Sequence, residues 1–194
     1  IERLSLAHEV DSNVFYGIHI ALTADKEQIK EAVDTYNNFQ EVIGFKLYAG
    51  HSVGNVGVIE EESQQQVYYA LKEFGYKGIV VLHCEKDSLL KPELWDPNNP
   101  ITHAYARSPE AEIESVRDQI NFSIDAKFNG IVHIAHISVP EAVDVVQRAK
   151  NKIKITCGVT PHHLIFNLHK MEEPNGLLYK INPPLRSESM RITM

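Results

Sequence analysis

Apolar runs and charged amphipathic stretches alternate along most of the chain. The apolar runs are rich in valine and isoleucine, and most are followed by a longer stretch that mixes apolar and charged residues. Continuous apolar runs of this kind indicate strands buried on both faces, and their alternation with helices predicts parallel β-α-β units. The predicted strands cover 14–23, 41–50, 78–85, 130–138 and 152–160, and the predicted helices cover 25–39, 60–74, 108–128 and 140–150.

Residues at the helix starts support these boundaries. Asp25 and Ser108 are good N-cap residues, and Pro140 suits a first helical position. The Pro- and Asn-rich passage from Lys91 to Pro100, "KPELWDPNNP", predicts a long excursion after a strand. Barrel enzymes carry substrate loops at such places.

Five strands of this type fit either a doubly wound sheet or part of a (β/α)8 barrel. A complete barrel typically needs about 250 residues, and this chain has 194. No Gly-rich phosphate-binding fingerprint follows any predicted strand, which counts against a dinucleotide-binding fold. We therefore predict an α/β fold that is an incomplete (β/α)8 TIM-type barrel.

Composition narrows the classes of partner. Hydrophobic residues make up 43% and charged residues 23%, which is typical of a globular protein, and the formal net charge is −7. This charge offers no general attraction to nucleic acid or an anionic membrane, and no apolar run is long enough to predict a membrane span. Cys84 and Cys157 lie in apolar runs, so we expect buried thiols in a reducing compartment and a cytoplasmic protein.

The two ends of the chain suggest missing neighbours. The opening "IERLSLAHEV" lacks an initiator methionine and carries charges where a signal peptide needs an apolar stretch. The ending "SESMRITM" is abrupt. We expect a fragment of a longer protein.

Candidate chemistry recurs at the predicted strand ends. Lys46 ends one strand within "GFKLYAG", His83 ends the next and His136 the one after. Barrel enzymes keep their chemistry at the carboxyl ends of strands, so these groups converge if their strands are neighbours. Histidine is the commonest metal ligand, and a pair on adjacent strands could hold zinc.

Lysine becomes a metal ligand when its neutral amine takes up carbon dioxide, because the carbamate can bridge two cations. Burial lowers the pKa of a lysine and favours that neutral amine. Two plainer interpretations of Lys46 stay open: a side chain that reaches solvent, or one paired with an acid. For His19 and His133 we expect hydrogen-bonded core residues rather than ligands.

Six segments of the sequence, in this order, resemble the dihydroorotases of the amidohydrolase superfamily. Hydantoinases and allantoinases share the barrel and the bridging lysine, whereas "TPHHL" and "NPPLR" resemble dihydroorotase specifically. The six segments are "GFKLYAG", "VLHCE", "RSPEAEIESV", "HIAHIS", "TCGVTPHHL" and "NPPLR".

The resemblance implies reversible hydrolysis of dihydroorotate to N-carbamoyl-aspartate, a step of pyrimidine biosynthesis. It implies two zinc ions bridged by carboxylated Lys46, with His83 and His136 on the second ion, and Asn182 in contact with the substrate. It also implies a small-molecule partner, and it leaves homo-oligomerisation open. His162 and His163 lie in a family motif, but the resemblance assigns them no chemistry.

Two departures from the family pattern limit these expectations. The His-x-His pair with its nearby arginine, expected on the first strand, does not occur, and the last-strand aspartate that acts as ligand and base would follow Met194. Residues 1–194 are thus expected to be the central part of one metal-dependent hydrolase barrel domain, without its catalytic residue. Such a chain alone should have an open barrel, a damaged metal site, an uncarboxylated Lys46 and negligible activity.

Two other functions remain compatible with the sequence. One is a non-catalytic dihydroorotase-like scaffold subunit, which the missing ligands would permit. The other is a cyclic amidohydrolase of the hydantoinase or allantoinase type, with a different ring as its substrate.

Overall fold

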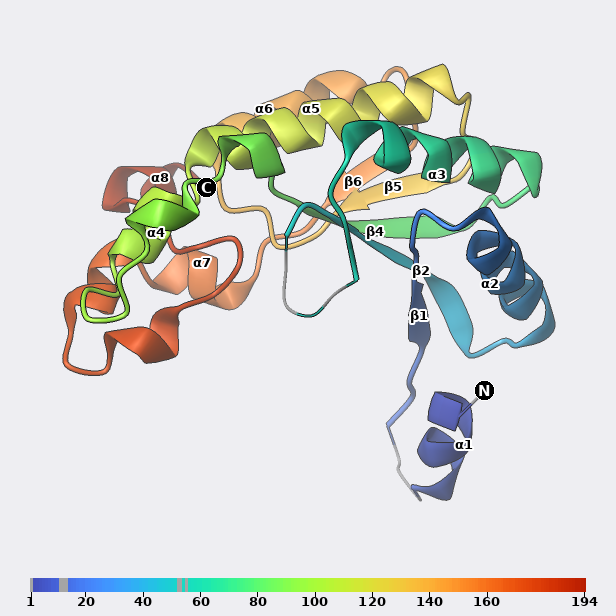
Figure 1. Ribbon diagram of the computed structural model, residues 1–194, viewed down its shortest axis with the longest axis horizontal. Coiled ribbons are helices and arrows are strands. Elements are labelled where there is room, and N and C mark those ends of the chain that lie inside the picture. Colours follow the sequence, from blue (N-terminus) through green and yellow to red (C-terminus); the bar gives the residue numbers. More distant parts are fainter. Residues whose placement is uncertain (1, 11–13, 52–53, 55) are drawn as a thin grey trace.

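The computed structural model describes residues 2–10, 14–51, 54 and 56–194, and a curved parallel sheet dominates it (Figure 1). The strand order is β1-β2-β4-β5-β6, and the short β3 pairs with β2. Neighbouring strands therefore follow one another along the chain, as right-handed β-α-β units require. The strands are β1 Ile18–Ala21, β2 Val42–Ala49, β3 Gly57–Val58, β4 Ile79–Cys84, β5 Ile131–Ile134 and β6 Ile155–Cys157.

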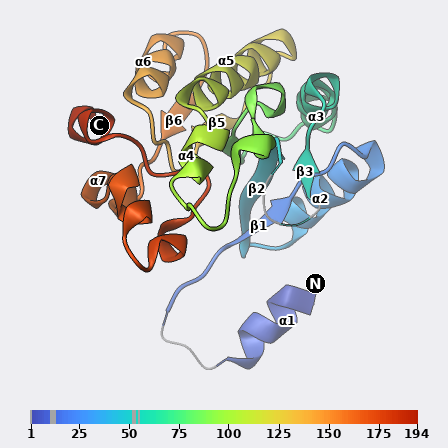
Figure 2. The same cartoon turned by 60° about the vertical axis from the view of Figure 1, so that its left-hand side comes forward.

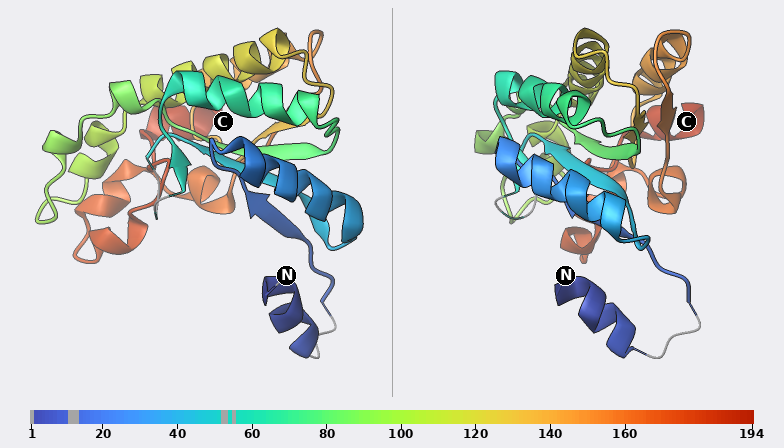
Figure 3. Two further views of the ribbon diagram at one scale, coloured as in Figure 1. Left: turned by 45° about the vertical axis from the view of Figure 1, so that its right-hand side comes forward. Right: turned by 90° about the vertical axis from the view of Figure 1, so that its right-hand side faces the viewer.

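Four of the helices, α2, α3, α5 and α6, cover one face of the sheet (Figure 1). The others include α1, which stands away from the packed layers (Figure 3), and α4, α7 and α8, which gather beyond the carboxyl ends of the strands (Figure 2). The α-helices are α1 Glu2–Glu9, α2 Lys26–Asn38, α3 Glu61–Glu73, α4 Thr102–Ala106, α5 Pro109–Asp125, α6 Pro140–Ala149, α7 Pro161–Ile165 and α8 Glu188–Thr193. Short 3-10 turns occupy Asp87–Leu89, Pro92–Leu94, Leu168–Glu172 and Gly176–Tyr179.

The main core lies between the sheet and these four helices. Within β2, Phe45 and Leu47 are fully buried on the helix side, whereas Lys46 and Tyr48 alternate with them and are only half-buried. Ile131 of β5 is 36% exposed. The prediction of strands buried on both faces is thus wrong for this chain, because helices of its described residues cover one face only.

Several predicted boundaries shorten in the structure. The strand expected at 14–23 begins at Ile18, that at 152–160 is confined to Ile155–Cys157, and that at 130–138 ends at Ile134. The helix expected to reach Phe128 ends at Asp125, where Lys127 takes a left-handed conformation with φ of 51°. A residue of this kind is a common helix terminator.

Two of the three predicted helix starts have the expected chemistry. The Asp25 carboxylate accepts a hydrogen bond of 2.9 Å from the Glu27 amide, and Pro140 opens α6. Ser108 occupies the N-cap of α5, but its hydroxyl makes no capping bond. The predicted excursion, residues 91–100, contains the 3-10 turn Pro92–Leu94 and leads into α4. Within the described residues, no helix has the length and apolar character needed to cross a bilayer.

Candidate functional site

One cavity of about 490 Å³ opens on the helix-free face of the sheet, near the strand ends. The register of the sheet forms it, because Tyr48 of β2 pairs with His83 of β4. All four residues predicted to form the site line this cavity, so the structure brings them together. Their roles stay predictions. The lining residues are Lys46, Tyr48, His83, His136, Thr160, His162, Lys180, Ile181 and Asn182.

Two of the four do not lie where the sequence places them. Lys46 does not end its strand, because β2 continues to Ala49, and His136 follows the end of β5 in the loop before α6. His136 has a φ of 41°. This region is uncommon for a residue with a Cβ, and such backbone outliers cluster at functional sites. The outlier therefore marks the loop as a candidate functional element.

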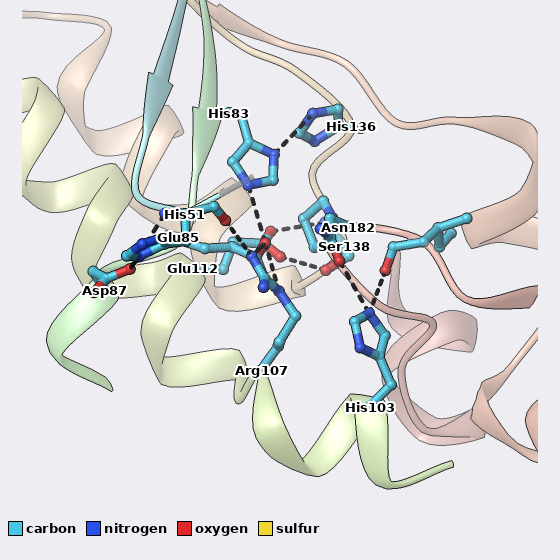
Figure 4. A network of polar contacts seen from close by, with 12 residues as sticks. His51, His83, Glu85, Asp87, His103, Arg107, Glu112, His136, Ser138 and Asn182 are labelled. Atoms are coloured by element: carbon cyan, nitrogen blue, oxygen red, sulfur yellow. Dashed lines mark hydrogen bonds and ion pairs between the residues drawn. The ribbon is translucent and has the colours of Figure 1, made fainter. Parts of the chain in front are cut away.

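The two imidazoles face each other across the cavity (Figure 4). Nδ1 of His83 lies 3.4 Å from Nε2 of His136. A tetrahedral zinc ion holds nitrogens at about 2.0–2.1 Å, which separates two such ligands by roughly 3.4 Å. The spacing of this pair therefore fits two ligands of one ion.

The protonation of His136 also fits a metal ligand. Burial, together with the neighbouring His83 and Lys46, lowers its pKa to about 3. Its Nδ1 is buried and, among the described residues, finds no hydrogen-bond partner beyond the backbone of His136 itself. The ring is therefore neutral at physiological pH, which is the form that binds a metal.

Lys46 projects into the same cavity as an amine of lowered basicity. Burial lowers its pKa to about 8, against a small opposing effect of Cys84, and its Nζ lies 5.0 Å from the centre of the Tyr48 ring. No carboxylate pairs with it in the described part of the chain. A large neutral fraction is therefore present near pH 8, as carbamate formation requires.

The ligand set is incomplete in this chain. The described residues contain no group of three or more His, Cys, Asp or Glu side chains placed to hold a metal ion. The pair of histidines with Lys46 beside it fits part of a zinc centre. A carbamate on Lys46 would add oxygen ligands to that part.

The ion pair of Glu85 and Arg107 lies against His83. Oε2 of the fully buried Glu85 lies 3.0 Å from Nε2 of His83. Arg107 donates from Nε to both Glu85 oxygens at 3.0 Å and from Nη2 at 2.6 Å. Burial alone would raise the pKa of Glu85, but His83 and Arg107 together lower it to about 2. The carboxylate occupies Nε2, so Nδ1 is the nitrogen that faces the cavity.

A second buried pair holds the loop of His136. Glu112 accepts hydrogen bonds from the amides of Ser138 at 2.7 Å and Val139 at 3.2 Å, and from the Ser138 hydroxyl. Arg186 donates to Glu112 at 3.2 Å and to the Ser138 oxygen at 2.9 Å. Burial raises the pKa of Glu112, and Arg186 opposes that rise. These bonds fix the backbone that immediately follows His136.

The adjacent histidines of "TPHHL" have different environments. His163 contacts the Thr160 hydroxyl through Nδ1 at 2.6 Å and the Pro183 carbonyl through Nε2 at 3.1 Å. Burial lowers its pKa to about 4, although the Pro183 bond opposes this. Both of its nitrogens are thus used in packing the loops. His162 lines the cavity and is the member of the pair available to a ligand.

The expectations for His19 and His133 have different outcomes. Nδ1 of His133 lies 2.8 Å from the Thr156 hydroxyl, so this histidine is hydrogen-bonded as predicted, although it is only half-buried. His19 is exposed on β1, and the expectation of a core residue is wrong. β1 is at one edge of the sheet, where no further strand of the described residues covers it.

Sequence reasoning missed the supporting residues and one further histidine. Each supporting residue lies inside a segment that carried the family resemblance, and a charged residue within such a segment was the available signal. Their partners could not be read from the sequence because they are distant along the chain. The missed residues are Glu85, His103, Arg107, Glu112 and Arg186.

Comparisons with known proteins agree on one group of enzymes, although no protein-family model matches the chain. It is 34% identical over 120 residues to a dihydroorotase of Methanosphaera stadtmanae, covering 58% of this chain and 27% of that protein. It is 36% identical over 129 residues to a dihydroorotase of Methanothermobacter thermautotrophicus, covering 65% and 29%. A D-hydantoinase of Geobacillus stearothermophilus is 27% identical over 181 residues, covering 89% and 37%.

Solved structures confirm the fold. A dihydropyrimidinase from Brevibacillus agri superposes with a TM-score of 0.81 at 24% identity, covering 98% of this chain and 42% of that one. A D-hydantoinase gives 0.81 at 23% identity, with coverages of 99% and 43%. The chain thus spans less than half the length of the relatives described here. The predicted incomplete TIM-type barrel is confirmed.

The buried amine of Lys46 should make stability depend on pH. Below about pH 8, Lys46 is charged in the folded and unfolded states alike, so folding must desolvate a charge; above 10.5 it is neutral in both. We expect Lys46→Met to raise the free energy of unfolding by roughly 1–3 kcal/mol at pH 7, with the gain vanishing as pH rises from about 8 to 10.5. Urea unfolding across this range measures it.

Lys30→Met is the matched control, because Lys30 is exposed and pairs with Asp34 on the surface at 3.0 Å. Its effect should stay within a few tenths of a kcal/mol at all pH values. If the free energies of unfolding of the two variants depended on pH in the same way, Lys46 would be solvated in the folded protein.

Removing one partner of the buried Glu112–Arg186 pair should strongly destabilise the fold. We expect Glu112→Ala to cost roughly 3–5 kcal/mol, because it leaves the buried guanidinium uncompensated. Glu173→Ala removes the exposed pair with Lys170 at 2.6 Å, and should cost at most about 1 kcal/mol. Denaturant unfolding compares the two, and a Glu112→Ala loss as small as that of Glu173→Ala would contradict the assignment.

Proposed function

We propose that the intact protein is a zinc-dependent dihydroorotase. The premise is that this chain is a dihydroorotase- and hydantoinase-like part of the amidohydrolase superfamily and matches segments of longer proteins. Its reaction would be the reversible hydrolysis of dihydroorotate to N-carbamoyl-aspartate in pyrimidine biosynthesis. The observation that carries the proposal is the 3.4 Å spacing of His83 Nδ1 and His136 Nε2 in the cavity that also holds Lys46 and Asn182. Residues 1–194 would form the central part of one barrel domain.

In this proposal His83 and His136 would hold one zinc ion, and Lys46, as a carbamate, would supply oxygen ligands for it and for a second ion. Bound zinc supplies Lewis-acid chemistry, which lowers the pKa of water and polarises a carbonyl. The chain's own contribution is to place these ligands. Glu85 contacts the ring of His83, Glu112 holds the loop of His136, and the burial of Lys46 keeps its amine neutral enough to react with carbon dioxide.

Within the superfamily, sequence favours the dihydroorotase reaction. The two dihydroorotases are 34% and 36% identical to this chain over their matched segments, against 27% for the D-hydantoinase. The hydantoinase match is longer, covering 89% of the chain, so a hydantoin-type ring is the second candidate substrate. The solved structures support only the fold at their level of identity.

The setting of the reaction is part of the same proposal. Both cysteines, Cys84 and Cys157, are free thiols, as expected in the reducing cytoplasm. The partner would be a small cyclic amide, since the acidic chain offers neither nucleic acid nor an anionic membrane a general attraction.

Substrate and metal assays on the intact protein test this function. We expect turnover of dihydroorotate to exceed that of hydantoin and allantoin, with zinc bound. Preference for hydantoin or allantoin would assign another cyclic amidase, and an inactive protein without divalent metal would be a scaffold.

Variants of Lys46 test its proposed role in that protein. Lys46→Ala should lose zinc and activity, with partial recovery when a short carboxylic acid is added in place of the carbamate. Lys46→Arg should also be inactive, because arginine stays charged and cannot form a carbamate. Lys30→Ala, at an exposed helix position, is the control. An active Lys46→Arg enzyme would contradict the assignment.

A further inference from the structure

Beside the proposed zinc ligands, one buried histidine controls the predicted substrate contact. His103 lies on α4 and is 4% exposed. Its Nε2 is 2.9 Å from the Ile181 carbonyl oxygen and 3.0 Å from Oδ1 of Asn182, so a single nitrogen faces two oxygens (Figure 4). The ring packs edge-on against Trp95, at 5.5 Å between ring centres.

The Ile181 carbonyl decides where the proton of His103 lies. A carbonyl oxygen only accepts hydrogen bonds, so Nε2 must carry the hydrogen and donate. Burial lowers the pKa of His103, although the Ile181 bond opposes the shift, so the ring is neutral and Nε2 holds its one proton. The tautomer of His103 is thereby fixed.

The fixed tautomer in turn sets the side-chain amide of Asn182. The nitrogen and oxygen of an amide are interchangeable in shape, and the hydrogen-bond network decides between them. With N–H on His103, only Oδ1 can face it, because the opposite orientation would bring two donors together. Nδ2 of Asn182 is then the polar atom left for a ligand, and no hydrogen bond among the described residues uses it.

We propose that His103 is a positioning residue that makes Asn182 present an N–H donor to the cavity, so that Asn182 binds an oxygen of the substrate rather than a ring N–H. This inference rests on the proposed function for the presence of a cyclic amide. It assigns Asn182 to an acceptor, either a carbonyl or a carboxylate oxygen, both of which dihydroorotate carries. A ligand that placed an N–H there would leave two donors unpaired, which is strongly disfavoured in a partly buried site.

Two kinds of variant of the intact protein test this positioning. His103→Leu removes the donor and frees the Asn182 amide to rotate, so KM for dihydroorotate should rise roughly ten- to hundredfold with kcat changed much less. His103→Gln, whose amide can donate to the same oxygens, should recover part of the loss. Asn182→Asp keeps the shape but replaces the donor by an acceptor, and should raise KM at least as much.

Two measurements separate positioning from general destabilisation. Nitrogen chemical shifts of the His103 ring in the unliganded protein should show the Nε2–H tautomer. His169→Leu is the control, because the His169 side chain is exposed and pairs with the nearby Glu172 at 2.7 Å, and its KM should be unchanged.

The following results would overturn the inference about His103 or the proposed function. An Nδ1–H tautomer, or a folded His103→Leu enzyme with unchanged KM, would overturn the inference. If His103→Leu does not fold, an unchanged KM in Asn182→Asp overturns it instead. If the protein hydrolyses no cyclic amide, the proposed function fails, while the tautomer measurement still decides the role of His103.

Discussion

Two buried carboxylate–guanidinium pairs determine the geometry of the cavity. Both carboxylates and Arg186 are almost entirely removed from solvent, whereas the Arg107 side chain keeps 14% exposure. Arg186 also donates through Nη1 to the Arg107 carbonyl at 2.5 Å. Burying charges is costly, and their attraction compensates only when nearly every donor and acceptor is used. Both carboxylates meet that condition here. The two pairs therefore hold His83 and the loop of His136 in one arrangement.

The sheet gives these pairs a fixed frame. The period of two along β2 places Phe45 and Leu47 against the helices and leaves Lys46 and Tyr48 on the opposite face. The same register brings Tyr48 alongside His83. A lysine inside an apolar strand is thus explained by the face it occupies, and its lowered pKa follows from partial burial without a compensating carboxylate among the described residues.

The parts predictable from sequence are those set by local pattern. Alternating apolar and amphipathic stretches were enough to predict parallel neighbouring strands, and with them the convergence of Lys46, His83 and His136. The sequence could not reveal that His136 lies in a loop with φ of 41°, because the bonds that hold this loop, from the amides of Ser138 and Val139 to Glu112, join residues far apart along the chain. The contact between His103 and Asn182 was equally hidden, since the two residues lie far apart along the chain.

The start of α5 links the two supporting pairs. Arg107 precedes the N-cap of this helix and Glu112 lies in its first turn, so both residues, whose contacts support His83 and the loop of His136, lie in one short segment. We expect a displacement of that segment to act on both imidazoles at once, so the two histidines depend on a single structural element rather than on two.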